Sequence, residues 1–182
     1  STTSPAWLRS ETVSSNPARR AGSVPVVHIL LATDADWIVE EVTGALGGEG
    51  DTFTVCRDGR AVAGQVKNTT PDLAILDLQI GTMGGMAVTM DLRLDESAGA
   101  LPHVPVLMLL DRQADLHLAR RCGAEGWMIK PLDSLRLGKA AHSVLDGGTY
   151  TEGLPAEPAS DTSDDEADEA ADSSEEVPAT AG

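Results

Sequence analysis

Five short apolar runs alternate with five segments of helical periodicity along this chain. The apolar runs are residues 26–32, 52–56, 73–76, 104–110 and 127–129, and the helical segments are residues 36–46, 60–66, 86–94, 114–121 and 134–145. Nearly continuous apolar runs are typical of strands that are covered on both faces. Strictly alternating strands and helices favour parallel pairing with right-handed crossovers. The sequence therefore predicts a doubly wound α/β fold, a five-stranded parallel sheet with helices on both faces.

The composition divides the chain into one core and two tails. Hydrophobic residues make up 41% of the 182 residues but aromatic residues only 3%, so we expect an aliphatic core. The last 32 residues contain eleven acidic residues and no Lys or Arg, so they carry −11 of the net charge of −16. We predict a disordered leader at 1–24, one folded domain at 25–148 and an acidic disordered tail at 149–182.

The cysteines and the hydropathy pattern bear on the compartment. Cys56 and Cys122 match no metal-ligand spacing, which favours reduced thiols in a cytosol over a disulfide. No apolar stretch approaches the roughly 20 residues that cross a bilayer, and the N-terminal segment lacks the apolar centre of a signal peptide. We expect a soluble, cytoplasmic protein with no membrane partner. The sparse lysine and abundant alanine, glycine and aspartate are typical of a GC-rich bacterial genome.

An acid and a base follow two of the predicted strands. Asp77 ends the third apolar run and Lys130 ends the fifth. Open α/β sheets place their reactive groups at the carboxyl edge, where both side chains would lie. A carboxylate nucleophile beside a lysine can accept a phosphoryl group.

The order of these elements and three local stretches resemble the receiver domain of bacterial two-component response regulators. The stretches are residues 71–78, 83–86 and 122–131. The resemblance implies the strand order 2-1-3-4-5 and a phosphoacceptor at Asp77, which would take its phosphoryl group from a sensor histidine kinase or phosphotransfer protein. It also implies Mg²⁺ held by Asp34, Asp77 and the backbone carbonyl of Gln79, with Lys130 binding a phosphoryl oxygen.

The chain departs from the family pattern around this site. Thr33 stands where the first of two adjacent acids is usual, so less charge would hold the metal, and Asp36 is expected to start the next helix. Leu110 stands where a Thr or Ser normally contacts the phosphoryl group, and Trp127 replaces the usual Tyr or Phe. These last two are the predicted switch positions.

Two smaller features concern the loops that follow the strands. Gly81 replaces a common proline after the acceptor and makes that loop more flexible. Asp111 follows the fourth strand, and we expect its carboxylate to point outward and cap the next helix. If it pointed inward, it would repel a phosphoryl dianion.

The main functional hypothesis is a single-domain response regulator, a signalling domain rather than an enzyme, that acts through protein contacts. Its unknown target, or a second copy in a homodimer, would bind the last helices and strand. The basic group expected there comprises Arg120, Arg121, Arg136 and Lys139, beside Trp127. The acidic charge and the absence of an apparent output module disfavour direct DNA binding.

Two alternatives remain open. An atypical receiver could act as an adaptor or scaffold without phosphorylation, because an acid and a hydroxyl are missing. A flavodoxin-like cofactor-binding enzyme would share the topology, but the segment 33–36 places acids where a cofactor phosphate would sit. The acidic tail could solubilise the protein or shield its basic surface.

Overall fold

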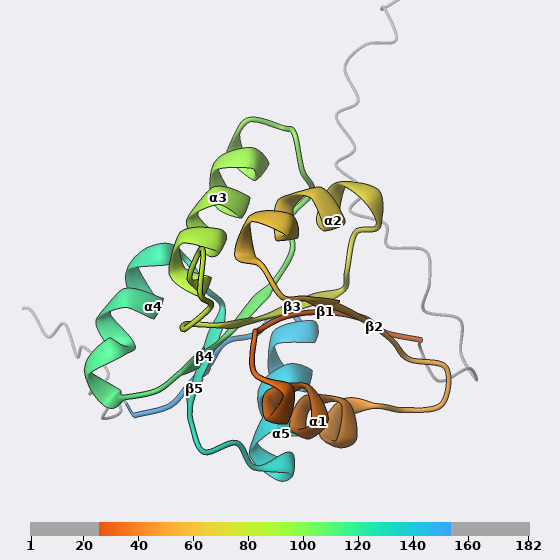
Figure 1. The fold of residues 1–182 in the computed structure, drawn as a ribbon, viewed down its shortest axis with the longest axis vertical. Coiled ribbons are helices and arrows are strands. Elements are labelled where there is room, and N and C mark those ends of the chain that lie inside the picture. The colour runs from red at the N-terminus through yellow and green to blue at the C-terminus, as the bar shows by residue number, and fades with distance from the viewer. Residues whose placement is uncertain (1–25, 154–182) are drawn as a thin grey trace, which may run out of the picture.

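Six parallel strands form one sheet in the computed structural model, which describes residues 26–153. The strands are β1 His28–Ala32, β2 Thr52–Cys56, β3 Leu73–Asp77, β4 Val106–Leu110, β5 Gly126–Ile129 and β6 Tyr150–Thr151, in the order β2-β1-β3-β4-β5-β6. The helices are α1 Asp36–Leu46, α2 Val62–Asn68, α3 Gly85–Ser97, α4 Leu116–Cys122 and α5 Ser134–Leu145. Helices α1 and α5 cover one face of the sheet, and α2, α3 and α4 cover the other (Figure 1).

The core follows from the alternation of side chains along the central strands. In β1, Leu31 packs toward α1 and α5, whereas Leu30 packs toward α2 and α3. All five residues of β3 and of β4 are buried, as expected for strands covered on both faces. The buried residues are almost all aliphatic, which confirms the expected aliphatic core.

The predicted five-strand core, with the order 2-1-3-4-5, is confirmed, and most of the predicted elements lie within a few residues of their expected bounds. The helices predicted at 60–66 and 114–121 each begin with a short 3₁₀ turn, Gly59–Ala61 and Gln113–Asp115. Asp133 caps α5 as expected, because its carboxylate accepts a hydrogen bond from the Arg136 backbone N–H at 3.0 Å.

A sixth strand corrects the predicted boundary of the acidic tail. Residue 149 was expected to begin a disordered segment, but Tyr150 and Thr151 pair with β5. The ordering has a physical cause, since Tyr150 packs against the core and the carboxylate of Glu152 is paired with Arg136. The leader at 1–24 and the rest of the tail, from 154 onward, lie outside the described residues.

The other expectations concern thiols and membranes. Cys56 and Cys122 are both free and buried, and burial raises the pKa of each thiol. Within residues 26–153, none of the helices combines the length and hydropathy that a membrane crossing requires.

Close packing of α3 against the end of β3 places the acceptor candidate. A Cβ atom added to Gly85, the first residue of α3, would lie 2.5 Å from the backbone oxygen of Asp77. Only glycine allows this approach without a shift of either backbone segment. Gly64 in α2 offers a contrast, because nothing lies within 4 Å of its added Cβ.

We expect Gly85→Ala to lower the free energy of unfolding by about 1–3 kcal/mol, because the new methyl group overpacks the contact with β3. Its matched control, Gly64→Ala, should instead raise that free energy by about 0.5–1 kcal/mol, since alanine favours a helix and has room there. Urea unfolding of both variants measures the difference. Equal effects of the two substitutions would contradict the close approach at Gly85.

Candidate functional site

Asp77 ends β3 and is only 1% exposed, so its carboxylate depends on hydrogen-bond donors from the protein. Its Oδ1 accepts from the Lys130 ammonium at 2.7 Å and from the Gln79 backbone N–H at 3.1 Å. Its Oδ2 accepts from the Thr33 hydroxyl at 3.0 Å. The carboxylate is therefore held by donors that come from three separate parts of the chain.

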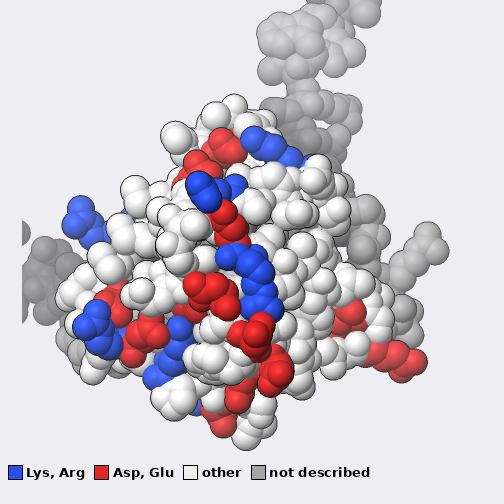
Figure 2. Space-filling view, viewed as in Figure 1, with Lys and Arg blue, Asp and Glu red and all other residues white. Residues whose placement is uncertain are grey.

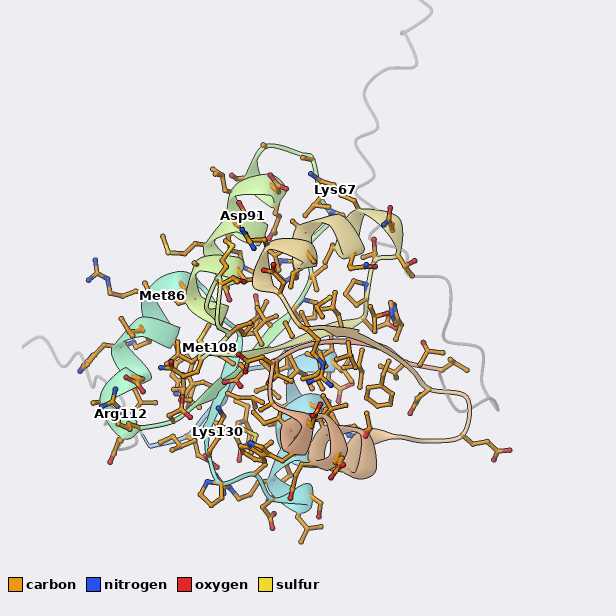
Figure 3. The ribbon with its side chains drawn as sticks, in the orientation of Figure 1. Lys67, Met86, Asp91, Met108, Arg112 and Lys130 are labelled. Atoms are coloured by element: carbon orange, nitrogen blue, oxygen red, sulfur yellow. The ribbon has the colours of Figure 1, made fainter. Side chains whose placement is uncertain are left out.

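Lys130 follows β5 and is fixed at both its backbone and its side chain. Its backbone N–H donates to the Leu110 carbonyl at 2.8 Å, which extends the pairing of β5 with β4. The ammonium lies 5.9 Å from the centre of the Trp37 ring, within reach of a cation–π interaction. The Lys130 side chain is 11% exposed and lies between the sheet edge and the α1/α5 layer (Figure 3). Asp77 and Lys130 thus meet as the sequence predicted.

Asp111 corrects an expectation. Its carboxylate was expected to point outward and cap the next helix, but its Oδ1 accepts a hydrogen bond from the Lys130 ammonium at 3.0 Å. The ammonium attracts this exposed side chain because Asp111 follows β4 directly and lies beside the end of β5. The Lys130 ammonium therefore donates hydrogen bonds to two carboxylates, those of Asp77 and Asp111.

Thr33 does more than leave an acid missing. Its side chain is fully buried, and its hydroxyl donates to Asp77 while accepting the Ala35 backbone N–H at 3.2 Å. A neutral donor thus occupies the place of a negative charge and provides a hydrogen bond to one oxygen of the buried Asp77 carboxylate. The sequence shows that Thr33 directly follows the first strand, but it does not show which way the hydroxyl points.

The predicted metal ligands are all oxygen donors. Asp34 is exposed, and its Oδ2 accepts the Gly81 backbone N–H at 3.1 Å. Asp36 starts α1, as expected, and pairs with Arg57 at 2.6 Å instead of facing the site. Within residues 26–153 no three His, Cys, Asp or Glu side chains are grouped to hold a metal. Two carboxylates and a carbonyl nevertheless fit Mg²⁺, which commonly binds one or two carboxylates and retains several waters.

The two predicted switch positions lie in the cluster beneath α4. Leu110 is fully buried there and offers the site no hydrogen-bond donor. Trp127 is 5% exposed and packs in the same cluster, while its indole N–H donates to the backbone carbonyl of Glu152 at 3.2 Å. The indole therefore points inward and is hydrogen-bonded to Glu152, the residue that follows β6.

The basic group expected on the last helices is partly neutralised. The guanidinium of Arg136 is paired with Glu152, so it does not offer the unpaired charge that the sequence suggested. Figure 2 shows acidic and basic side chains interspersed over the viewed face of the molecule.

Comparison with known families identifies one match. The model of the response regulator receiver domain matches residues 29–142. This span contains every predicted site residue, strands β2 to β5 and all of β1 except His28.

Curated relatives include two groups of regulators. The chain is 31% identical over 138 residues to transcriptional regulatory protein CseB of Streptomyces avermitilis, covering 75% of this chain and 56% of that protein. It is 33% identical over 106 residues to DNA-binding response regulator MtrA of Mycolicibacterium smegmatis, covering 57% of this chain and 44% of that protein. The chain thus spans about half the length of these relatives.

Solved structures agree on the fold. The signal receiver domain of a histidine kinase from Syntrophus aciditrophicus has a TM-score of 0.59 at 26% identity, over 71% of this chain and 98% of that one. Chemotaxis response regulator CheY4 of Vibrio cholerae has a TM-score of 0.58 at 23% identity, over 65% of this chain and 98% of that one. The second likeness, at this identity, concerns the fold alone.

We expect Lys130→Met to lower the free energy of unfolding by about 3–5 kcal/mol, because it leaves the buried Asp77 carboxylate without its cation. Asp111→Asn removes only a partly exposed contact and should cost less than about 1 kcal/mol. Adding Asp77→Asn to Lys130→Met should restore much of the loss, because the orphaned charge is gone. Urea unfolding of the three variants tests this, and equal losses for Lys130→Met and Asp111→Asn would contradict it.

Proposed function

This chain belongs to the response regulator receiver domain family, and on that premise we propose that it is a signalling domain whose Asp77 accepts a phosphoryl group. The observation that carries the proposal is the Lys130 ammonium 2.7 Å from the buried Asp77 carboxylate at the carboxyl edge of the sheet. The resemblance implied Asp77 as the acceptor, and this contact supports it because a lysine ammonium lies beside the proposed nucleophile.

The residues divide the chemistry among them. A carboxylate oxygen of Asp77 attacks the phosphorus of a donor, and the bond from phosphorus to the leaving group breaks, with its electron pair departing on the leaving group. Lys130 and the Gln79 N–H already contact Oδ1 and hold the carboxylate in place, and the Lys130 ammonium would offset the negative charge of the incoming phosphoryl oxygens. Mg²⁺, when held by Asp34, Asp77 and the Gln79 carbonyl, supplies further charge compensation between two anions.

The partners follow from the same chemistry. The donor is a sensor histidine kinase or phosphotransfer protein, and the output is a contact with another protein or a second copy of the chain, made in the cytoplasm. The curated relatives are named as transcriptional or DNA-binding regulators. We assign no DNA contact to this receiver, because the net charge of −16 would repel the phosphate backbone.

A second candidate is an adaptor that works without phosphorylation. Three observations favour it: Asp111 shares the Lys130 ammonium, Thr33 replaces an acid, and Leu110 offers no hydroxyl. The shared ammonium weakens the attraction for an incoming dianion, and Asp111 adds repulsion.

Incubation with acetyl phosphate and Mg²⁺ distinguishes the two candidates. We expect one added phosphoryl group in the intact mass of the wild-type chain and none in Asp77→Ala. Asp111→Asn should accelerate the reaction by about tenfold, since removing one like charge near the site is worth about 1 kcal/mol or slightly more. An unmodified wild-type chain at saturating donor would favour the adaptor.

The threonine at position 33, where an acid is usual, leads to a prediction about Mg²⁺ affinity. Thr33→Asp restores a second carboxylate beside Asp34, and we expect it to tighten Mg²⁺ binding by about tenfold or more, because an opposite charge close to the metal contributes over 1 kcal/mol. Isothermal titration with MgCl₂ measures the change. Thr33→Ser, which keeps the hydroxyl, is the control, and equal Mg²⁺ affinity in the Asp and Ser variants would contradict the expectation.

A further inference from the structure

The β5 strand would be the edge of the sheet without the short segment after α5. Gly126 of β5 pairs with Tyr150 and Trp127 pairs with Thr151, in parallel register. The Tyr150 backbone N–H donates to the Glu125 carbonyl at 3.3 Å. An edge strand presents unpaired backbone groups to any extended chain, and here the protein's own chain takes them.

Glu152 supplies most of the specific contacts of this segment. Its Oε1 accepts from the Arg136 Nε at 2.7 Å and the Tyr150 hydroxyl at 3.3 Å. Its Oε2 accepts from the Ile129 backbone N–H at 2.9 Å and from the Arg136 Nη2. Burial alone would raise the pKa of Glu152, but the hydrogen bonds from Arg136 and Ile129 outweigh it and lower that pKa. Arg136 and the end of β5 thus form a carboxylate receptor.

Two glycines shape the site for an extended chain. A Cβ atom on Gly126 would lie 2.8 Å from Val144 Cγ2 and 3.2 Å from the Tyr150 carbonyl oxygen, so a side chain there would push the sixth strand away. Gly153 has a φ of +79°, and its added Cβ would lie 3.1 Å from Ile129 Cδ1. Gln113 donates to the Gly153 carbonyl at 3.0 Å, so the position after the glutamate is also recognised.

We propose that the β5 edge and Arg136 form a binding site for an extended peptide segment that carries a carboxylate followed by glycine, and that residues 150–153 are its resident ligand. A partner protein bearing such a segment adds a parallel strand to the sheet in place of the resident one, by β-strand addition. Backbone pairing supplies affinity, while the Arg136 fork and the Ile129 N–H select the carboxylate.

The resident segment is suited to exchange. Strand β6 has two residues, below the usual length of a strand, and Thr151 is exposed. The binding of this segment to β5 depends largely on the Glu152 side chain, so removing its carboxylate should release the segment and open the site. Binding at this site requires no phosphodonor, so its failure would leave the proposed role of Asp77 untouched.

A labelled peptide with the sequence of residues 148–154, Gly-Thr-Tyr-Thr-Glu-Gly-Leu, tests the proposal by fluorescence anisotropy on the full chain. We expect Glu152→Ala to bind it about tenfold more tightly than the wild-type chain, because the site is no longer occupied by its competitor. Glu41→Ala, which removes an exposed acid on α1, should bind like the wild type. The peptide with Ala in place of Glu should not bind, and neither should the Glu152→Ala/Arg136→Ala chain.

Hydrogen exchange shows separately whether the site has opened. In Glu152→Ala the Ile129 amide should exchange about tenfold faster than in the wild type, since it loses a charge-assisted hydrogen bond, and Glu152→Gln should lie between the two. Unchanged exchange would overturn the role of Glu152. Faster exchange without peptide binding, or equal binding of the Glu and Ala peptides, would overturn the carboxylate site.

Discussion

The buried ion pair between Asp77 and Lys130 is the interaction on which the rest of the structure depends. An ionised carboxylate that is 1% exposed is tolerated only with a cation and hydrogen bonds around it. The two residues are 53 positions apart, and they meet because β3, β4 and β5 pair in parallel with Asp77 beside Leu109 and Leu110 beside Ile129. The arrangement that satisfies the buried charge also assembles a nucleophile with its charge partner.

Two neighbours of this pair change the charges around it. Thr33 contributes a neutral donor in place of an acid, and Asp111 contributes an acid beside the lysine. The Asp77 carboxylate consequently receives all its observed hydrogen bonds from the protein, while the Lys130 ammonium is shared by Asp77 and Asp111. Under the proposed function, the choice between phosphoacceptor and adaptor would depend on how strongly the Lys130 ammonium is attracted to an incoming dianion.

Strand β5 connects this site with the far edge of the sheet. Its end carries Lys130 toward Asp77, and its outer edge carries the Ile129 N–H toward Glu152. Trp127, on the same strand, packs under α4 and donates its indole N–H to the backbone carbonyl of Glu152. One short strand thus contacts both the ion pair at its end and residues 150–152 along its outer edge.

The sequence by itself determined the alternation of strands and helices, the aliphatic core, and Asp77 and Lys130 at strand ends, because periodicity and local residue order carry that information. Tertiary structure alone decided that Asp111 faces Lys130, that the Thr33 hydroxyl holds Asp77, and that Tyr150 and Thr151 form a strand. Side-chain direction after a strand depends on charges distant in the chain, and a two-residue strand is too short to show a period. In the sequence Glu152 is one of many acidic residues, and only the fold shows that it pairs with Arg136.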